Sequence, residues 1–167
     1  MATRLHATQT EFMAAIDVIE QFVAEHDWPF DRQGDDELTL NLVGRWCDFH
    51  VWFSWRQHQQ ALNFACAFDL KIPPAKRAEM CQLVILMNER LSVGHFDIWQ
   101  EEGMVLYRHA LPLRGTLGPV PEQVEDLIEI ALTESERFYP AVQFVMWGDY
   151  TPQRALDGAL METVGQA

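Results

Sequence analysis

GRWCDFHVWFSWRQHQQALNFACAFDL, residues 44–70, decides the fold of this chain because it reads as two aromatic strands joined by a polar loop. The stretch holds three of the six tryptophans and four of the ten phenylalanines. A half-buried antiparallel strand alternates apolar with polar side chains, whereas the first run here carries large aromatic residues on both faces. One face comprises Phe49, Val51, Phe53 and Trp55, and the second comprises Trp46, Asp48, His50, Trp52 and Ser54.

The polar loop at residues 56–60 allows the two runs to be paired as a hairpin. In this register the phenylalanines of both strands point to one side, which we expect to be the core face. The other side sets tryptophan beside a floor of alanines and Asn63, which predicts a shallow groove. A shift of one residue would exchange the two faces. The expected pairs are Trp55 with Leu62, Phe53 with Phe64, Val51 with Cys66, Phe49 with Phe68, Trp52 with Ala65 and His50 with Ala67.

Amphipathic helices and further antiparallel strands make up the rest of the chain. A capping box formed by Thr8 and Glu11 is expected to start the first helix. The order of elements predicts an α+β fold, an antiparallel sheet of five or six strands with helices packed on one face. The expected helices cover residues 9–26, 74–91, 121–139 with a continuation over 141–147 beyond a kink at Pro140, and 152–163, and further strands cover residues 38–43, 95–100 and 104–113.

Composition and charge limit the classes of partner. We expect one domain over residues 1–167. Twelve basic residues against 25 acidic ones, with no basic cluster, disfavour nucleic acid and anionic membrane surfaces as partners. The N-terminus lacks the basic-then-apolar order of a signal peptide, and no run approaches the roughly 18 apolar residues of a membrane helix. A cytoplasmic protein with protein partners is therefore expected.

The cysteines predict neither a disulfide framework nor a zinc site. They number three, and none is in a CxxC spacing. We expect Cys47, Cys66 and Cys81 to be small buried residues because each has apolar neighbours in the sequence.

Two histidines offer an alternative function as a small-ligand or metal-binding sensor. With a three-residue turn at residues 101–103, His95 lies opposite His109, and Asp97 shares the face of His95, so the three could hold a metal ion. A two-residue turn would instead pair Asp97 with Arg108 in a salt bridge. Both registers stay open.

No enzyme motif emerges from the sequence. Asp48, His50 and Ser54 are the residue types of a hydrolytic triad, but each two-residue step along a strand covers nearly 7 Å, so they cannot converge. The glycines at 115 and 118 do not form a phosphate-binding loop, since no Lys-Ser/Thr pair follows. We therefore expect a protein that is not an enzyme and needs no cofactor.

Several short blocks stand out along the chain: Asp27-Trp28-Pro29-Phe30-Asp31-Arg32, Gly44-Arg45-Trp46-Cys47-Asp48, Asn88-Glu89-Arg90-Leu91, Gly94-His95-Phe96-Asp97, Arg108-His109-Ala110-Leu111, Glu136-Arg137-Phe138-Tyr139-Pro140 and Met161-Glu162-Thr163-Val164-Gly165. In this order they resemble the alphaproteobacterial branch of the YbjN family. The resemblance covers roughly residues 20–167 and implies an α+β fold similar to type III secretion chaperones, which are commonly dimers that bind extended segments of client proteins. It supplies no catalytic or ligand residues.

These observations predict a non-enzymatic protein-interaction module, chaperone-like or regulatory, that forms a homodimer. An extended client could add a strand at a sheet edge or lie in the aromatic groove. The second face could instead be covered by the chain's own N-terminal segment or last helix. The candidate partner-binding residues are Trp46, Asp48, His50 and Trp52 on the sheet and Phe144 and Trp147 at the end of the long helix.

Overall fold

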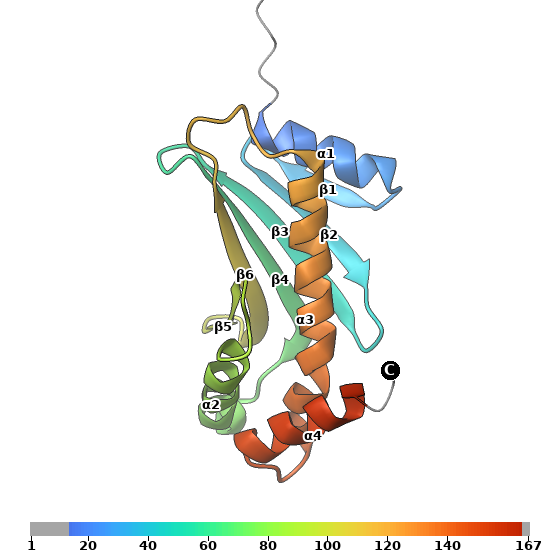
Figure 1. Ribbon diagram of the computed structural model, residues 1–167, viewed down its shortest axis with the longest axis vertical. Helices are drawn as coiled ribbons and strands as arrows, with labels where there is room; N and C mark the ends of the chain where they lie inside the picture. The colour runs from blue at the N-terminus through green and yellow to red at the C-terminus, as the bar shows by residue number, and fades with distance from the viewer. Residues whose placement is uncertain (1–13, 165–167) are drawn as a thin grey trace, which may run out of the picture.

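A computed structural model describes residues 14–164 and shows the expected α+β architecture, an antiparallel sheet with helices (Figure 1). None of the helices in this part of the chain is long and apolar enough to cross a membrane. The strands are β1 (Phe30–Gln33), β2 (Glu37–Val43), β3 (Asp48–Arg56), β4 (Ala61–Lys71), β5 (His95–Trp99) and β6 (Met104–Pro112). The α-helices are α1 (Ala15–Glu25), α2 (Arg77–Asn88), α3 (Pro121–Trp147) and α4 (Pro152–Val164).

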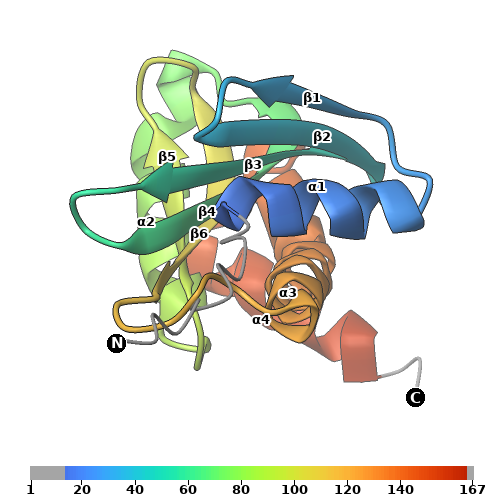
Figure 2. The same ribbon diagram turned by 90° about the horizontal axis from the view of Figure 1, so that it is seen from above.

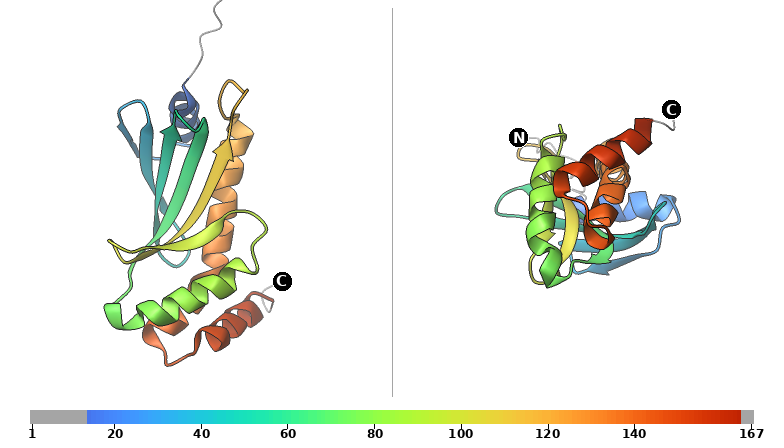
Figure 3. Two further views of the ribbon diagram at one scale, coloured as in Figure 1. Left: turned by 90° about the vertical axis from the view of Figure 1, so that its left-hand side faces the viewer. Right: turned by 90° about the horizontal axis from the view of Figure 1, so that it is seen from below.

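The six strands lie in the order β1-β2-β3-β4-β6-β5, and every neighbouring pair is antiparallel. The β3–β4 hairpin has the register expected from the sequence, with Trp55 opposite Leu62 and Phe49 opposite Phe68. Helices α1 and α3 pack against one side of the sheet (Figure 2). Helices α2 and α4 lie beyond one end of it (Figure 3).

Aromatic side chains fill the core between the sheet and α3. Phe68 of β4 meets Tyr139 of α3 edge-on at 5.6 Å between ring centroids, and Phe96 of β5 meets Phe138 at 5.7 Å. All four are at least 96% buried. Full burial of such a side chain is worth about 2 kcal/mol, and edge-to-face geometry adds to it. The alternation of phenylalanines in residues 44–70 therefore determines which face of the sheet the helices cover.

Three helices differ from those expected, and the second, expected over residues 74–91, covers Arg77–Asn88 after a short 3-10 helix at Pro74–Lys76. Ala14 is extended and its N–H donates to the side chain of Asp17 at 3.0 Å, so the first helix starts at Ala15 rather than at residue 9. The expected capping box at residues 8–11 lies outside the described residues. Helix α3 continues through Pro140. Proline inside a helix costs about 3 kcal/mol, and the burial of α3 on both sides of Pro140 offsets this loss.

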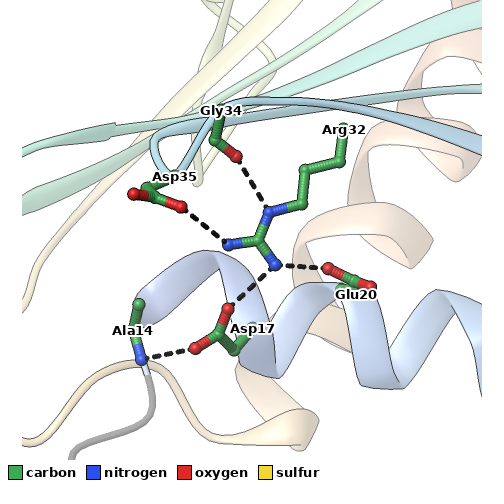
Figure 4. Close-up of polar contacts among 6 residues, drawn as sticks. All are labelled: Ala14, Asp17, Glu20, Arg32, Gly34 and Asp35. Atoms are coloured by element: carbon green, nitrogen blue, oxygen red, sulfur yellow. Dashed lines mark hydrogen bonds and ion pairs between the residues drawn. The ribbon is translucent and has the colours of Figure 1, made fainter.

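Arg32 ties helix α1 to the edge strand β1 (Figure 4). Its Nη1 donates to Asp17 Oδ1 at 2.9 Å and to the carboxylate of Glu20, and its Nε donates to the carbonyl of Gly34 at 2.9 Å. These hydrogen bonds, first to Glu20 and then to Asp17, raise the pKa of Arg32 above its usual value. One side chain thus connects the helix, the strand and the turn that follows it.

The other edge of the sheet, β5, is closed by side chains. Asn88, at the end of α2, accepts the Phe96 N–H at 2.7 Å and donates to the Phe96 carbonyl at 3.0 Å. Asp97 accepts the N–H of its neighbour Ile98 at 2.8 Å. An exposed edge strand offers unpaired backbone groups to another chain, and here Asn88 satisfies both groups of Phe96 as a neighbouring strand would. The β5 edge is consequently poorly suited to adding a client strand.

We predict that Asn88→Ala lowers the free energy of unfolding by about 2 kcal/mol, because two part-buried backbone groups lose their partner. The matched control is Gln82→Ala, which removes an exposed amide from the same helix. Urea unfolding of both variants measures the difference. Equal stability of the two variants would show that Asn88 does not hold the edge.

Candidate functional site

The face of the sheet opposite α1 and α3 carries the candidate site, and we call it the open face. The left view of Figure 3 looks onto it, with the strands in front and α3 behind. The strand registers assign its side chains, because residues paired across strands share a face. They include Glu37, Thr39 and Asn41 of β2, Asp48, His50, Trp52, Ser54 and Arg56 of β3, Asn63, Ala65 and Ala67 of β4, Met104, Leu106, Arg108 and Ala110 of β6, and His95, Asp97 and Trp99 of β5.

An apolar cluster, separate from the main core, occupies the centre of the open face. The half-buried rings of Trp52 and Trp99 meet edge-on, with centroids 5.9 Å apart and an interplanar angle of 80°. Together with Ala65 they cover a small buried set, Ala67, Met104 and Leu106. A tryptophan pair of this geometry contributes about 1 kcal/mol beyond the burial of its area. The cluster therefore fixes the positions of both rings.

The Trp52–Trp99 pair separates two hollows. The larger, of about 680 Å³, extends over β2, β3, β4, β6 and β5, a volume within the usual range of ligand sites. The smaller, of about 340 Å³, lies on the other side of the pair and is lined by His50, Asp69, Lys71 and Glu102. The polar side chains around the larger hollow include Glu37, Ser54, Arg56, Asn63, His95 and Arg108.

Trp46, expected on this face beside Trp52, lies elsewhere. Strand β3 begins at Asp48, and the N–H of Arg45 in the preceding bend donates to the carboxylate of Glu136 on α3 at 2.6 Å. The Arg45 guanidinium lies over the Trp46 ring, 4.9 Å from its centroid, and Trp46 is 43% exposed. The expected position is wrong because we extended the strand alternation through a bend that sits against the helix.

Trp99 is the tryptophan that joins Trp52 in place of Trp46. It shares the strand alternation of His95 and Asp97, and this signal is visible in the sequence. The proximity of Trp99 to Trp52 is not visible in the sequence, because Trp99 belongs to β5 and two strands, β4 and β6, lie between β5 and β3.

His50 lies between the side chains of Asn41 and Asp69. Its Nδ1 lies 2.6 Å from Asn41 Oδ1, and its Nε2 lies 3.3 Å from Asp69 Oδ1. The hydroxyl of Ser54 is buried without a hydrogen-bond partner, so His50 does not activate it as a nucleophile. Asp48 is exposed at the start of β3. As expected from strand geometry, the three residues do not converge.

The β5–β6 hairpin has a register that we did not expect. Trp99 pairs with Met104, so the connecting loop contains the four residues 100–103. His95 consequently lies opposite Arg108. Neither the three-residue nor the two-residue turn is formed, because loop length sets the register of a hairpin and a single residue changes every pair.

This register separates the candidate metal ligands. His109 pairs with Phe64 and belongs to the core side of the sheet, whereas His95 lies on the open face. Burial, and then the nearby His95, lower the pKa of His109. Asp97 forms a 3.1 Å salt bridge with Arg108. Among residues 14–161, whose side chains the structure describes, no group of three or more His, Cys, Asp or Glu side chains is placed to hold a metal ion.

Phe144 and Trp147 belong to the end of α3. This helix packs on the side of the sheet opposite the open face, and its last turns lie close to α4 (Figure 1). Phe144 is half-buried and stacks on Tyr150 with ring centroids 5.1 Å apart. Trp147 is 64% exposed. The two parts of the candidate site expected from the sequence thus belong to separate surfaces.

The cysteines differ more in exposure than we expected. Cys66 is fully buried, Cys47 is half-buried and Cys81 is exposed on α2. Burial raises the pKa of Cys66 to about 12 and also raises the pKa of Cys47. The expectation of three buried thiols is wrong for Cys81, because an apolar local sequence does not show which side of a helix faces solvent.

We predict that iodoacetamide at pH 8 modifies Cys81 first, Cys47 at least about tenfold more slowly and Cys66 only after unfolding. A thiol with a pKa near 12 has about one part in ten thousand as reactive thiolate at pH 8. Time-resolved peptide mass spectrometry, with a urea-unfolded sample as control, measures the order. Rapid modification of Cys66 in the folded protein would contradict the buried core.

The element order and the sheet topology place this protein in the class of α+β proteins whose fold is like that of type III chaperones. Its fold is similar to a chain in the "Structure of the HopA1-SchA Chaperone-Effector Complex", with a TM-score of 0.52 and 9% identity over 78% of this chain and 95% of that chain. The chain belongs to the YbjN family, "Putative bacterial sensory transduction regulator", whose model matches residues 15–144.

A second solved structure that matches this chain is the "Crystal structure of YbjN, a putative transcription regulator from E. coli". The match has a TM-score of 0.48 and 13% identity, and it covers 72% of this chain and 90% of that chain. No curated protein sequence matches the chain.

Proposed function

We propose that this protein is a non-enzymatic interaction module, one YbjN-like domain over residues 1–167, that binds a protein partner on its open face in a chaperone-like or regulatory role. The observation that carries the proposal is the Trp52–Trp99 cluster, an aromatic patch held in place between two hollows. Aromatic patches of this kind are enriched in protein interfaces. Membership of the YbjN family and the likeness to a chaperone–effector complex chain support the same reading.

The mode of binding follows from the closed edge at β5. Because Asn88 already satisfies the backbone groups of Phe96, an extended client is better accommodated across the open face than beside β5. His50 and Asp48 border the path of such a segment, with His50 fixed by Asn41 and Asp69. The net charge of −13 favours a protein over a nucleic acid as the partner. We propose that this interaction takes place in the cytoplasm.

A separate surface is available for self-association. Trp147 is 64% exposed at the end of α3, and Ile85 of α2 is 62% exposed. Ile85 also lines a shallow apolar hollow with Leu86 and Pro152. Large exposed apolar side chains of this kind mark interfaces, and we propose that this helical end, with Phe144 as internal support, forms the contact of a homodimer.

We predict that Trp52→Ala weakens capture of partner proteins by about tenfold or more, because a central tryptophan is typically a main contributor to binding. The test compares tagged full-length variants expressed in the native host, with quantitative mass spectrometry of what co-purifies. Trp147→Ala is the matched control on the other side of the sheet. If the Trp52→Ala variant is folded by circular dichroism and captures partner proteins as well as the wild type does, the proposal is contradicted.

We predict the opposite pattern for self-association. Trp147→Ala shifts the sedimentation equilibrium toward monomer by about tenfold in the dissociation constant, because it removes an exposed aromatic anchor. Trp52→Ala leaves this equilibrium unchanged. A wild-type protein that sediments only as a monomer at high concentration would contradict the dimer.

A further inference from the structure

The smaller hollow combines apolar and charged lining residues. Trp52 and Trp99 supply aromatic rings whose positions are fixed by their edge-on contact. Asp69, Lys71 and Glu102 supply the charges. Lys71 lies 3.7 Å from Glu102, and the two side chains are 76% and 48% exposed. Lys71 therefore offsets the charge of Glu102, and the carboxylate of Asp69, which is 64% exposed, remains.

Asp69 is one of two neighbouring carboxylates that lack a basic partner. Among the residues that the structure describes, neither Asp69 nor Asp48 forms an ion pair with lysine or arginine. Asp48 precedes Phe49 and Asp69 follows Phe68, and these phenylalanines are paired, so the two carboxylates occupy neighbouring positions on the open face. Burial is the largest cause that raises the pKa of the nearby Cys47, and the charges of Asp69 and Asp48 raise it further. Negative charge at this place is thus not balanced by a cation of the chain.

A neutral His50 does not supply the missing donor. The side-chain oxygen of Asn41 lies 2.6 Å from Nδ1 and can only accept, so Nδ1 carries the proton. Nε2 then presents a lone pair toward Asp69 Oδ1 at 3.3 Å. Two acceptors consequently face each other at the edge of the hollow, and a charged N–H donor from outside the chain is complementary to both.

We propose that the smaller hollow binds an arginine or lysine side chain of the protein partner, with its aliphatic stem against Trp52 and Trp99 and its cation at Asp69. The inference rests on the proposed function of the open face and adds the chemistry of the partner. Long basic side chains bury their stems along apolar surface and keep the charged head at a polar edge, and a guanidinium also stacks on tryptophan. The net charge of −13 is complementary to a basic segment.

The experiment uses the immobilised full-length protein and a display library of randomised nine-residue peptides at 150 mM salt and pH 8. Imidazole is neutral at this pH, and screening limits the reach of the net charge to about 8 Å. We expect the selected peptides to share an arginine or lysine beside large apolar residues. Synthetic copies with citrulline in place of arginine, or acetyl-lysine in place of lysine, should bind about fivefold more weakly, as expected for the loss of an exposed ion pair. Fluorescence anisotropy of labelled peptides measures the dissociation constants.

Variants then assign the cation to its site. Asp69→Asn should weaken the basic peptide about fivefold and remove most of the difference between this peptide and its neutral copy, as a double-mutant cycle records. Lys71→Gln, which removes a like charge from the hollow, should strengthen the basic peptide about twofold. The matched control is Asp126→Asn, which makes the same change of charge at an exposed position of α3 and should change nothing. Thermal melts confirm that each variant is folded.

The outcomes separate this inference from the proposed function. Peptides that depend on Trp52 but carry no basic residue, or that bind Asp69→Asn and Lys71→Gln as well as the wild type, would overturn the inference and leave the open face as the binding site. An equal loss with Asp126→Asn would show attraction by the net charge alone and would also overturn the inference. Peptides that bind equally well to Trp52→Ala, or a failure of any peptide to bind, would overturn both.

Discussion

The pairing of β3 with β4 is the constraint on which the rest of the structure depends. It places Phe49, Phe53, Phe64 and Phe68 on one side of the sheet, and each is buried there. Helices α1 and α3 must cover this side, since it carries the apolar area whose burial stabilises the fold. The same register leaves Trp52 and the alanines of β4 on the other side. The core and the open face are two consequences of one register.

Polar residues of the sequence blocks that resemble the YbjN family hold the scaffold together. Asn88 closes the β5 edge, Asp97 pairs with Arg108, the N–H of Arg45 reaches α3, and Arg32 ties α1 to β1. Trp52 and Trp99, at the centre of the open face, lie outside those blocks. The blocks thus contribute mainly to how the chain folds, whereas the Trp52–Trp99 cluster that carries the proposed function lies outside them.

The sequence predicts the structure correctly where a pattern is long and its connection is short. Phenylalanines recur on one face of both β3 and β4, and the short polar loop favours the register that brings them together. The prediction is wrong at the β5–β6 loop, where one additional residue moves His95 away from His109, and at Trp46, where a bend interrupts the strand. In both places the decisive quantity was a turn geometry, and several geometries fit the same residues.

By itself, the sequence determined the α+β class, the β3–β4 register and the face on which the helices pack, because side-chain alternation in a strand is a local property with a period of two. Tertiary structure alone decided that Trp99 rather than Trp46 stands beside Trp52, and that Arg108 and Asn63 border one hollow. These residues come from strands of one sheet that are distant in the chain, and β3 and β5 are also separated by two strands in the sheet order. Such proximity depends on the packing of the whole sheet, for which no local pattern in the sequence provides a signal.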